Sequence, residues 1–240
     1  MFKLYPKVSK KTYVYKKALS GREAFVVRVA SWSLLLCGLI FFTLGAGPII
    51  KDEVWYYVKE RLNVKTRLAN GENPGEGSVF SKYLTSQPIL IEPVNRDFSI
   101  VIEKIGVNAP IVADVPVSDE EAYNESLKSG IAHAAVSDYP SVEPGNVYLF
   151  AHSSLDFWKL GKFATVFNLL RKLEVGDLVH VFYEDEEYIY KVVNKEILSG
   201  WNTYPITRPV IEPTLTLQTC NPPGTTINRL VVTANLIEKR

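Results

Sequence analysis

The longest hydrophobic segment of the chain lies near its N-terminus. Residues 30–50 read ASWSLLLCGLIFFTLGAGPII and contain no charged side chain. A helix of this length rises about 31 Å, which matches the roughly 30 Å hydrocarbon core of a bilayer. The apolar region of a cleaved signal peptide is shorter, about 7–15 residues. The pattern therefore predicts one transmembrane helix that is kept as an uncleaved anchor.

A helical spacing of apolar side chains continues for a short distance after this segment. Val54, Tyr57, Val58 and Leu62 recur at that spacing within residues 51–68, so we expect the anchor helix to extend as a stalk. The next segment, NGENPGEG, concentrates glycine, asparagine and proline, which is typical of a linker. Residues 51–97 as a whole are expected to form a stalk and linker.

From residue 98 onward, apolar and polar positions follow the two-residue period of β-strands. Strands are predicted at residues 98–103, 107–115, 146–151, 178–184, 188–197, 214–220 and 228–237. Many short strands separated by turn residues indicate a sandwich or a barrel. The fold class is therefore mostly β.

Two short helices and one tight turn are expected between these strands. Ser118 and Glu121 have the spacing of a capping box, which predicts a helix that stops at Gly130. The apolar spacing of residues 163–170 predicts a second helix. The acidic residues 184–187 are interpreted as the solvated tip of a hairpin.

Charge is unevenly distributed along the chain. Residues 1–28 hold eight of the 27 basic side chains and one of the 26 acidic ones, so acidic residues prevail in the rest. The positive-inside rule places this tail in the cytoplasm and everything after residue 50 outside. The absence of a basic excess on the outer part argues against nucleic acid as a partner.

The predicted domains are a cytoplasmic tail (1–29), a transmembrane anchor (30–50), a stalk and linker (51–97) and a β domain (98–240).

Candidate chemistry outside the membrane begins with Cys220, because Cys37 lies within the apolar span. A thiol that attacks a carbonyl needs a neighbouring base or cation, most often a histidine. His180 lies inside a strand pattern and His133 follows the first short helix, and we expect packed, structural roles for both. His152 ends an apolar strand at the start of a loop, where a rigid scaffold commonly presents reactive groups.

A positive charge is expected beside the thiol. Cys220 closes a strand pattern that NPPG ends at once, and Arg229 opens the next strand. A hairpin between them would bring the guanidinium to the sulfur, where it could stabilise the oxyanion formed when a thiolate adds to a carbonyl. The spacing supports a site built from Cys220, His152 and Arg229, and an unreactive, exposed cysteine is the alternative.

The residues around Cys220 resemble a known family. The pentapeptide TLQTC, residues 216–220, resembles the TLxTC signature of sortases, the cysteine transpeptidases that attach proteins to bacterial cell walls or join pilins. Residues 105–111 resemble the early strand pair of the family, residues 144–153 its PGxxGN…GHs segment, and residues 163–177 its helix ending in GD. The resemblance covers residues 98–240.

Two positions depart from the family pattern. Ala151 stands where the family has glycine before the histidine, and Asn146 follows Pro144 and Gly145 without the usual intervening pair. Both departures weaken assignment to a sortase subclass. The chain also lacks the upstream aspartate-aromatic lid of pilin-polymerising sortases, which speaks against that role.

The resemblance implies a closed β-barrel of eight strands with a few short helices and a substrate groove along its side. It implies that Cys220 is the nucleophile, His152 the general acid and base, and Arg229 the group that stabilises the oxyanion or orients the substrate. Thr219 is implied to contact the substrate or the oxyanion region. The loop at residues 200–213 is expected to shape sequence choice, and the chemistry requires no metal or cofactor.

The expected function is that of a membrane-anchored transpeptidase of the bacterial cell surface. It would cleave a sorting motif of the LPxTG kind in exported proteins with a C-terminal sorting signal. It would then pass the acyl group to an amine of a peptidoglycan precursor or a protein lysine. Two alternatives stay open, namely a protease that resolves the same thioacyl intermediate with water, and a non-enzymatic membrane-tethered β-domain that binds a wall component.

Overall fold

A computed structural model describes residues 20–62, 64–69, 89–117, 119–151, 153, 163 and 165–240. The first element of the described part of the chain is a long helix, α1 (Gly21–Arg61). Its segment Gly21–Leu44 is long and apolar enough to cross a membrane. This confirms the predicted N-terminal apolar helix, although the candidate span begins and ends earlier than residues 30–50. The part of the chain from Leu44 onward forms one compact unit with the β domain.

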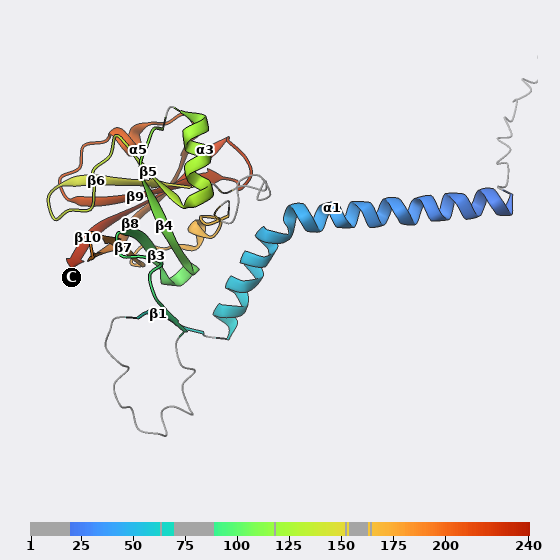
Figure 1. Cartoon of the computed structure of the whole chain (residues 1–240), viewed down its shortest axis with the longest axis horizontal. Helices are drawn as coiled ribbons and strands as arrows, with labels where there is room; N and C mark the ends of the chain where they lie inside the picture. The colour runs from blue at the N-terminus through green and yellow to red at the C-terminus, as the bar shows by residue number, and fades with distance from the viewer. Residues whose placement is uncertain are drawn as a thin grey trace, which may run out of the picture. The chain divides into compact units, whose positions relative to one another are not determined.

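Among the residues that the structure describes, eight strands form a closed barrel in the order β10-β8-β7-β3-β4-β5-β6-β9 (Figure 1). Their bounds are β3 Phe98–Ile102, β4 Val107–Val115, β5 Ile131–Ala134, β6 Gly145–Phe150, β7 Leu178–Tyr183, β8 Glu186–Ser199, β9 Pro213–Asn221 and β10 Asn228–Lys239. The predicted eight-stranded barrel is therefore confirmed. Two parallel pairs, β4 with β5 and β6 with β9, interrupt an otherwise antiparallel arrangement.

The alternation of apolar residues in the strands explains the barrel core. Ile100, Leu215, Leu217 and Val232 point into one apolar cluster and are fully buried, which is the usual consequence of the two-residue period in a closed sheet. Strand β3 is buried on both faces, because a second, smaller sheet covers its outer side.

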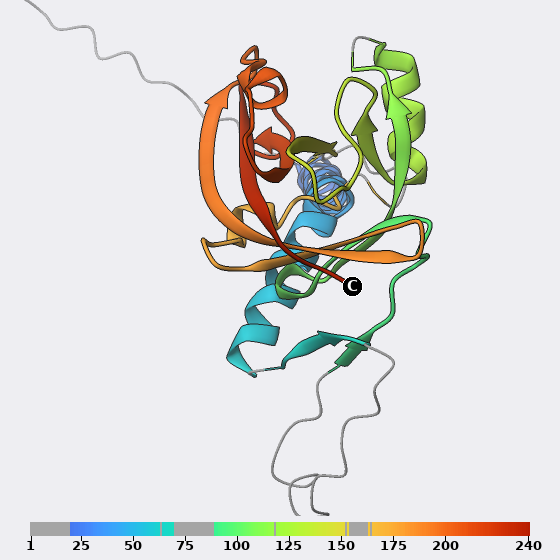
Figure 2. The same ribbon diagram turned by 90° about the vertical axis from the view of Figure 1, so that its left-hand side faces the viewer.

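This smaller sheet replaces part of the predicted stalk. Helix α1 ends at Arg61, and β1 (Thr66–Leu68) pairs in parallel with β2 (Ile89–Ile91). The pair lies beneath the barrel in Figure 2, where Leu68 and Ile91 pack on Val101 and Phe182. The prediction of a helix to residue 68 was wrong, since a strand pairing distant in sequence takes over there. The predicted linker at residues 70–77 lies outside the described residues.

The first short helix is present as α3 (Glu120–Ser129), beside β4 and β5 (Figure 1). Its cap is Asp119, whose carboxylate accepts hydrogen bonds from the backbone N–H groups of Glu121 and Ala122. The expected cap, Ser118, lies outside the described residues. Strand β5 follows directly after Gly130 and was not predicted, because its four residues, IAHA, are all buried and show no alternation of polar and apolar positions.

The remaining elements differ in detail from the predictions. The described part of residues 163–170 forms turns that lead into a 3-10 helix, η2 (Leu170–Lys172), instead of an α-helix. A short helix, α5 (Tyr204–Thr207), lies in the loop before β9. The hairpin tip between β7 and β8 is confirmed at Glu184 and Asp185, but Glu187 is buried and its Oε1 lies 2.7 Å from Nδ1 of His180.

The end of α1 docks on the barrel. Tyr56 is buried in the apolar core, and Glu53 forms ion pairs with Arg171 and with Lys172, the latter at 3.4 Å. The Lys172 ammonium also lies 5.1 Å from the centre of the Tyr56 ring, within the range of a cation–π contact. The end of the stalk helix is therefore packed against the barrel.

A close contact between Trp55 and Gly106 provides a test of this docking. Gly106 has φ +67°, and a Cβ placed there would meet Cη2 of Trp55 at 2.5 Å. G106A is expected to destabilise the full chain in detergent by at least about 1–2 kcal/mol from the left-handed backbone alone, and to displace the indole. Urea unfolding and tryptophan fluorescence measure both effects.

The matched control for this variant is G176A. Gly176 also has a positive φ, +102°, but a Cβ there would meet only Cε of Lys191 at 4.0 Å. G176A should cost backbone strain without changing the fluorescence of Trp55. Equal loss of stability in both variants, with identical spectra, would show that the contact between Trp55 and Gly106 contributes nothing.

Candidate active site

Cys220 and Arg229 lie opposite each other on paired strands. Cys220 is near the end of β9, Arg229 is near the start of β10, and the two form a directly opposed pair in the antiparallel ladder. Nη1 of Arg229 lies 3.6 Å from Sγ of Cys220. The same nitrogen donates to the carbonyl oxygens of Thr226 and Asn228, each at 3.3 Å. These bonds hold the guanidinium beside the half-buried thiol.

Burial and charge act in opposite directions on the thiol. Burial raises the pKa of Cys220, and the Arg229 guanidinium lowers it in part. Because burial is the larger effect, the thiol is the main form at neutral pH. A nucleophilic attack by this sulfur therefore requires a partner that accepts its proton.

Thr219 lies on the opposite face of β9 from Cys220, since successive strand residues alternate. Its side chain is buried, and its hydroxyl donates to the carbonyl oxygen of Ala151 at 2.9 Å. The backbone N–H of Ala151 in turn donates to the carbonyl of Gln218 at 3.2 Å. Thr219 thus ties the end of β6 to the cysteine strand from inside the barrel.

His152 lies outside the described residues, but its two neighbours in the chain are described. Ala151 is bound to β9 as above, and Ser153 is buried. The carbonyl of Ser153 accepts a hydrogen bond of 2.6 Å from the N–H of Gly224, in the loop that follows Cys220. Both neighbours of position 152 are therefore bonded to the segment that carries Cys220.

Two tyrosines near the pair of Cys220 and Arg229 were not found from the sequence. Tyr123 of α3 stacks on Phe150 with ring centres 5.3 Å apart, and Tyr148 lies on β6. Burial raises the pKa of both tyrosine hydroxyl groups. A negative charge on Cys220 raises the pKa of Tyr123 further. The positive charge of Arg229 acts in the opposite direction on both tyrosines. Both phenols therefore stay neutral at physiological pH. The sequence contained a signal for Tyr148, because Tyr148 and Phe150 are two residues apart in a strand pattern and therefore lie on one face. It contained none for Tyr123, because the approach of Tyr123 to Cys220 depends on how α3 packs on the barrel.

The other two histidines lie in packed positions. His133 is fully buried, and its Nε2 lies 3.0 Å from the carbonyl oxygen of Asp138. Burial lowers the pKa of His133. His180 pairs with Glu187 on the neighbouring strand, and both are buried. Neither histidine was proposed as catalytic.

Within the described ranges, no cluster of three or more His, Cys, Asp or Glu side chains could hold a metal ion.

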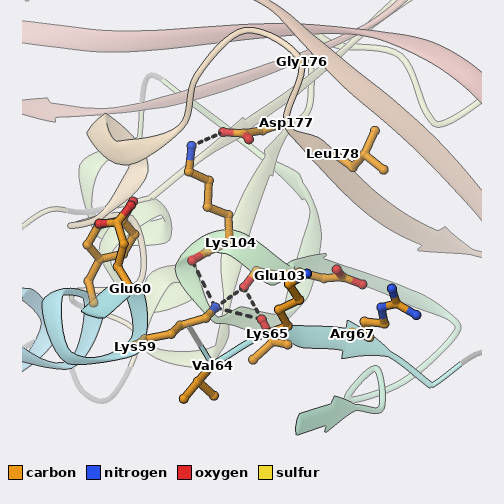
Figure 3. Close-up of a pocket in the computed structure, with 12 residues that line it drawn as sticks. Lys59, Glu60, Val64, Lys65, Arg67, Glu103, Lys104, Gly176, Asp177 and Leu178 are labelled. Carbon is orange, nitrogen blue, oxygen red and sulfur yellow. Dashed lines mark hydrogen bonds and ion pairs between the residues drawn. The ribbon is translucent and has the colours of Figure 1, made fainter. Parts of the chain in front are cut away.

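A cavity of about 490 Å³ lies between the end of α1, β1 and the 3-10 helix η1 (Glu103–Ile105) (Figure 3). Lys59 lines it and donates to the hydroxyl of Thr66 at 2.8 Å and to the carbonyl of Glu103 at 2.7 Å. Lys104 pairs with Asp177 at 2.9 Å. The cavity is lined neither by Cys220 nor by Arg229. Lys59 joins the end of α1 to β1 and η1, whereas the Lys104 side chain joins η1 to Asp177, just before β7.

A closed β-barrel that presents a half-buried cysteine beside an arginine is suited to acyl transfer through a thioester. A family model described as the Sortase domain matches residues 100–237, more than half of the chain. The chain therefore belongs to the sortase family, and it is a sortase-type cysteine transpeptidase.

Solved structures agree with this assignment at the level of the fold. Sortase C-1 from Actinomyces oris is 24% identical with a TM-score of 0.51, over 60% of this chain and 76% of that chain. Sortase C1 of GBS pilus island 1 is 25% identical with a TM-score of 0.50, over 59% of this chain and 64% of that chain. The comparison with curated proteins found no match.

Proposed function

We propose that the protein is a membrane-anchored transpeptidase that cleaves an LPxTG-like sorting motif and transfers the acyl group to an amine. The observation that carries the proposal is the separation of 3.6 Å between Cys220 Sγ and Arg229 Nη1 on paired strands. This arrangement sets a nucleophile beside a fixed positive charge. Family membership supports the reaction type, and the substrate motif follows from the family resemblance.

In the first step, the thiolate of Cys220 attacks the carbonyl carbon of the scissile peptide bond. His152 accepts the thiol proton, and the Arg229 guanidinium stabilises the negative charge that develops on the carbonyl oxygen. The C–N bond then breaks while the S–C bond is kept, and His152 donates the proton to the leaving amine. The product is a thioester on Cys220 and a released C-terminal fragment.

In the second step, an incoming amine attacks the thioester carbon. His152 removes the proton from the amine, a new amide bond forms, and the C–S bond breaks. The proton returns to Cys220 as the thiol. Because burial raises the pKa of Cys220, both steps need the proton transfers that we assign to His152. The hydrogen bonds of Ala151 and Ser153 to the segment that carries Cys220 support this assignment.

We assign the protein to a bacterial cell membrane with a single pass. The basic residues before the apolar helix support a cytoplasmic N-terminus and an outer catalytic domain. The proposed organisation is a cytoplasmic tail (1–29), an anchor (30–50), a stalk and linker (51–97) and the catalytic domain (98–240).

The proposed partners are exported proteins with a C-terminal sorting signal and an amine acceptor, either a peptidoglycan precursor or a protein lysine. The resemblance implies that Thr219 contacts the substrate or the oxyanion region; because its side chain is buried and its hydroxyl donates to Ala151, we propose instead that it acts by holding Ala151 in place.

The test uses the full chain in detergent micelles with an LPxTG peptide and an excess of triglycine or of an N-acetyl-lysine amide. We expect mass spectrometry to detect the peptide joined to the amine, with a thioester on Cys220 as the intermediate. A peptide with a scrambled motif serves as the control. Cleavage without any amine adduct would favour a protease that uses water, and no cleavage together with unmodified Cys220 would contradict the enzyme assignment.

A further inference from the structure

A buried chain of polar side chains connects the stalk helix to the residue next to His152. Nδ2 of Asn168 donates to Oδ2 of Asp52 on α1, at 3.4 Å. Oδ1 of Asn168 accepts from the hydroxyl of Ser153 at 2.8 Å. Ser153 and Asn168 are 2% and 3% exposed, so water cannot replace these partners at low cost. The chain ends one residue from His152.

The same serine reaches the loop that follows Cys220. Its carbonyl accepts the 2.6 Å hydrogen bond from the N–H of Gly224. The side chain of Ser153 therefore faces the stalk while its backbone faces the cysteine loop. Through two side-chain hydrogen bonds, the position of Asp52 is coupled to the segments that carry both His152 and Cys220.

The carboxylate of Asp52 determines which way the Asn168 amide points. An ionised carboxylate only accepts hydrogen bonds, so it selects the NH₂ group of Asn168. The amide oxygen then points to Ser153 and accepts from its hydroxyl. Without the carboxylate, the amide can turn over and present its NH₂ group to Ser153, which changes the hydrogen bonding of that residue.

Asp52 itself is held firmly. Tyr56, one helical turn later on α1, is buried in the barrel core. Burial raises the pKa of Asp52, whereas the hydrogen bonds from Asn168 and Thr165 and the charges of Lys51 and Arg171 lower it. A carboxyl group that is partly withdrawn from water and bonded in this way has a defined position.

We propose that Asp52 is a positioning residue for acyl transfer: through Asn168 and Ser153 it holds in place the loop that follows Cys220, the proposed nucleophile. The membrane stalk is then a part of the active-site scaffold, in addition to its role as a tether. The inference rests on the proposed roles of His152 and Cys220. It assigns no contact with substrate to Asp52.

The test compares D52A, D52N and E53Q in the full chain in detergent micelles. D52A should lower kcat for transfer about 10-fold to 100-fold, because small misplacements of a catalytic group cost that much, with little change in KM. D52N should retain most of kcat, since its amide oxygen can still accept from Asn168. E53Q removes a charge one residue away and weakens docking, but it leaves the hydrogen bonds between Asp52, Asn168 and Ser153 intact, so its kcat should stay near that of the unmodified protein.

Hydrogen exchange provides a readout that does not depend on activity. The amide of Gly224 should exchange faster in D52A than in the unmodified protein and in E53Q. Unchanged exchange in D52A, or equal losses of kcat in D52A and E53Q, would overturn the inference. If the unmodified protein transfers no acyl group, the proposed function fails, and the exchange of Gly224 still decides whether Asp52 positions this segment.

Discussion

Replacing Cys220 with alanine is expected to abolish both the transfer of an LPxTG peptide to an amine and the mass-trapped acyl adduct. The side chain of Cys220 is the proposed nucleophile, and alanine offers no atom that can form the thioester. The rate should fall by at least about 10³-fold, to background, because loss of a nucleophile removes the covalent pathway. Product mass and intact-protein mass measure the two effects.

The chain offers a matched control in its other cysteine. Cys37 lies in the apolar segment Gly21–Leu44 of α1, away from the proposed chemistry. C37A should therefore transfer the peptide at the rate of the unmodified protein and should form the same adduct. Transfer that survives in C220A, or an adduct on Cys37, would contradict the assignment of Cys220 as the nucleophile.

The substitution R229M is expected to slow transfer about 10²-fold to 10³-fold, the usual cost of losing one group that stabilises an oxyanion. It should also raise the pKa of Cys220 above its already raised value, because the guanidinium 3.6 Å from the sulfur favours the thiolate. At a fixed pH near 8, the thiolate fraction then falls and alkylation by iodoacetamide slows. Alkylation rates across a pH series give the shift directly.

Two further variants separate charge from position. R229K keeps a positive charge but loses the planar fork, so its thiol pKa should change less than that of R229M. Arg208 donates to the hydroxyls of Thr216 and Thr233, at 3.0 and 2.9 Å, and does not contact Cys220. R208M should therefore leave the alkylation profile of Cys220 unchanged. An equal shift in R208M and R229M would mean that the effect reflects net charge and not the pairing of Arg229 with Cys220.

Much of the barrel could be predicted from local patterns, because strands that bury one face alternate polar and apolar residues. The strands around Ile100, Leu217 and Val232 were predicted on this basis and are present. Strand β5 (Ile131–Ala134) was missed because its four residues are all buried, so no alternation appears. The stalk was predicted too long, since helical spacing cannot reveal that Thr66 begins a strand that pairs with β2.

The residues of the proposed site also fall into those that a local pattern could predict and those that only the packing of the fold brings together. Cys220 and Arg229 are nine residues apart, so a hairpin pattern was enough to predict that they meet. Tyr123 could not be found, because its approach to the thiol depends on how α3 packs beside β4 and β5. His152 was identified from its place at the end of a strand, and its role stays a prediction.

The amino-acid sequence by itself determined the N-terminal apolar helix, most of the strands and the meeting of Cys220 with Arg229, because each depends on periodicity or on residues joined by a short loop. The tertiary structure alone decided how the barrel closes and how the stalk attaches to it. Asp52 and Asn168 are 116 residues apart, and Trp55 and Gly106, which also meet, are 51 residues apart. Such contacts arise from the packing of whole elements against one another, which no local pattern of hydrophobic and polar residues specifies.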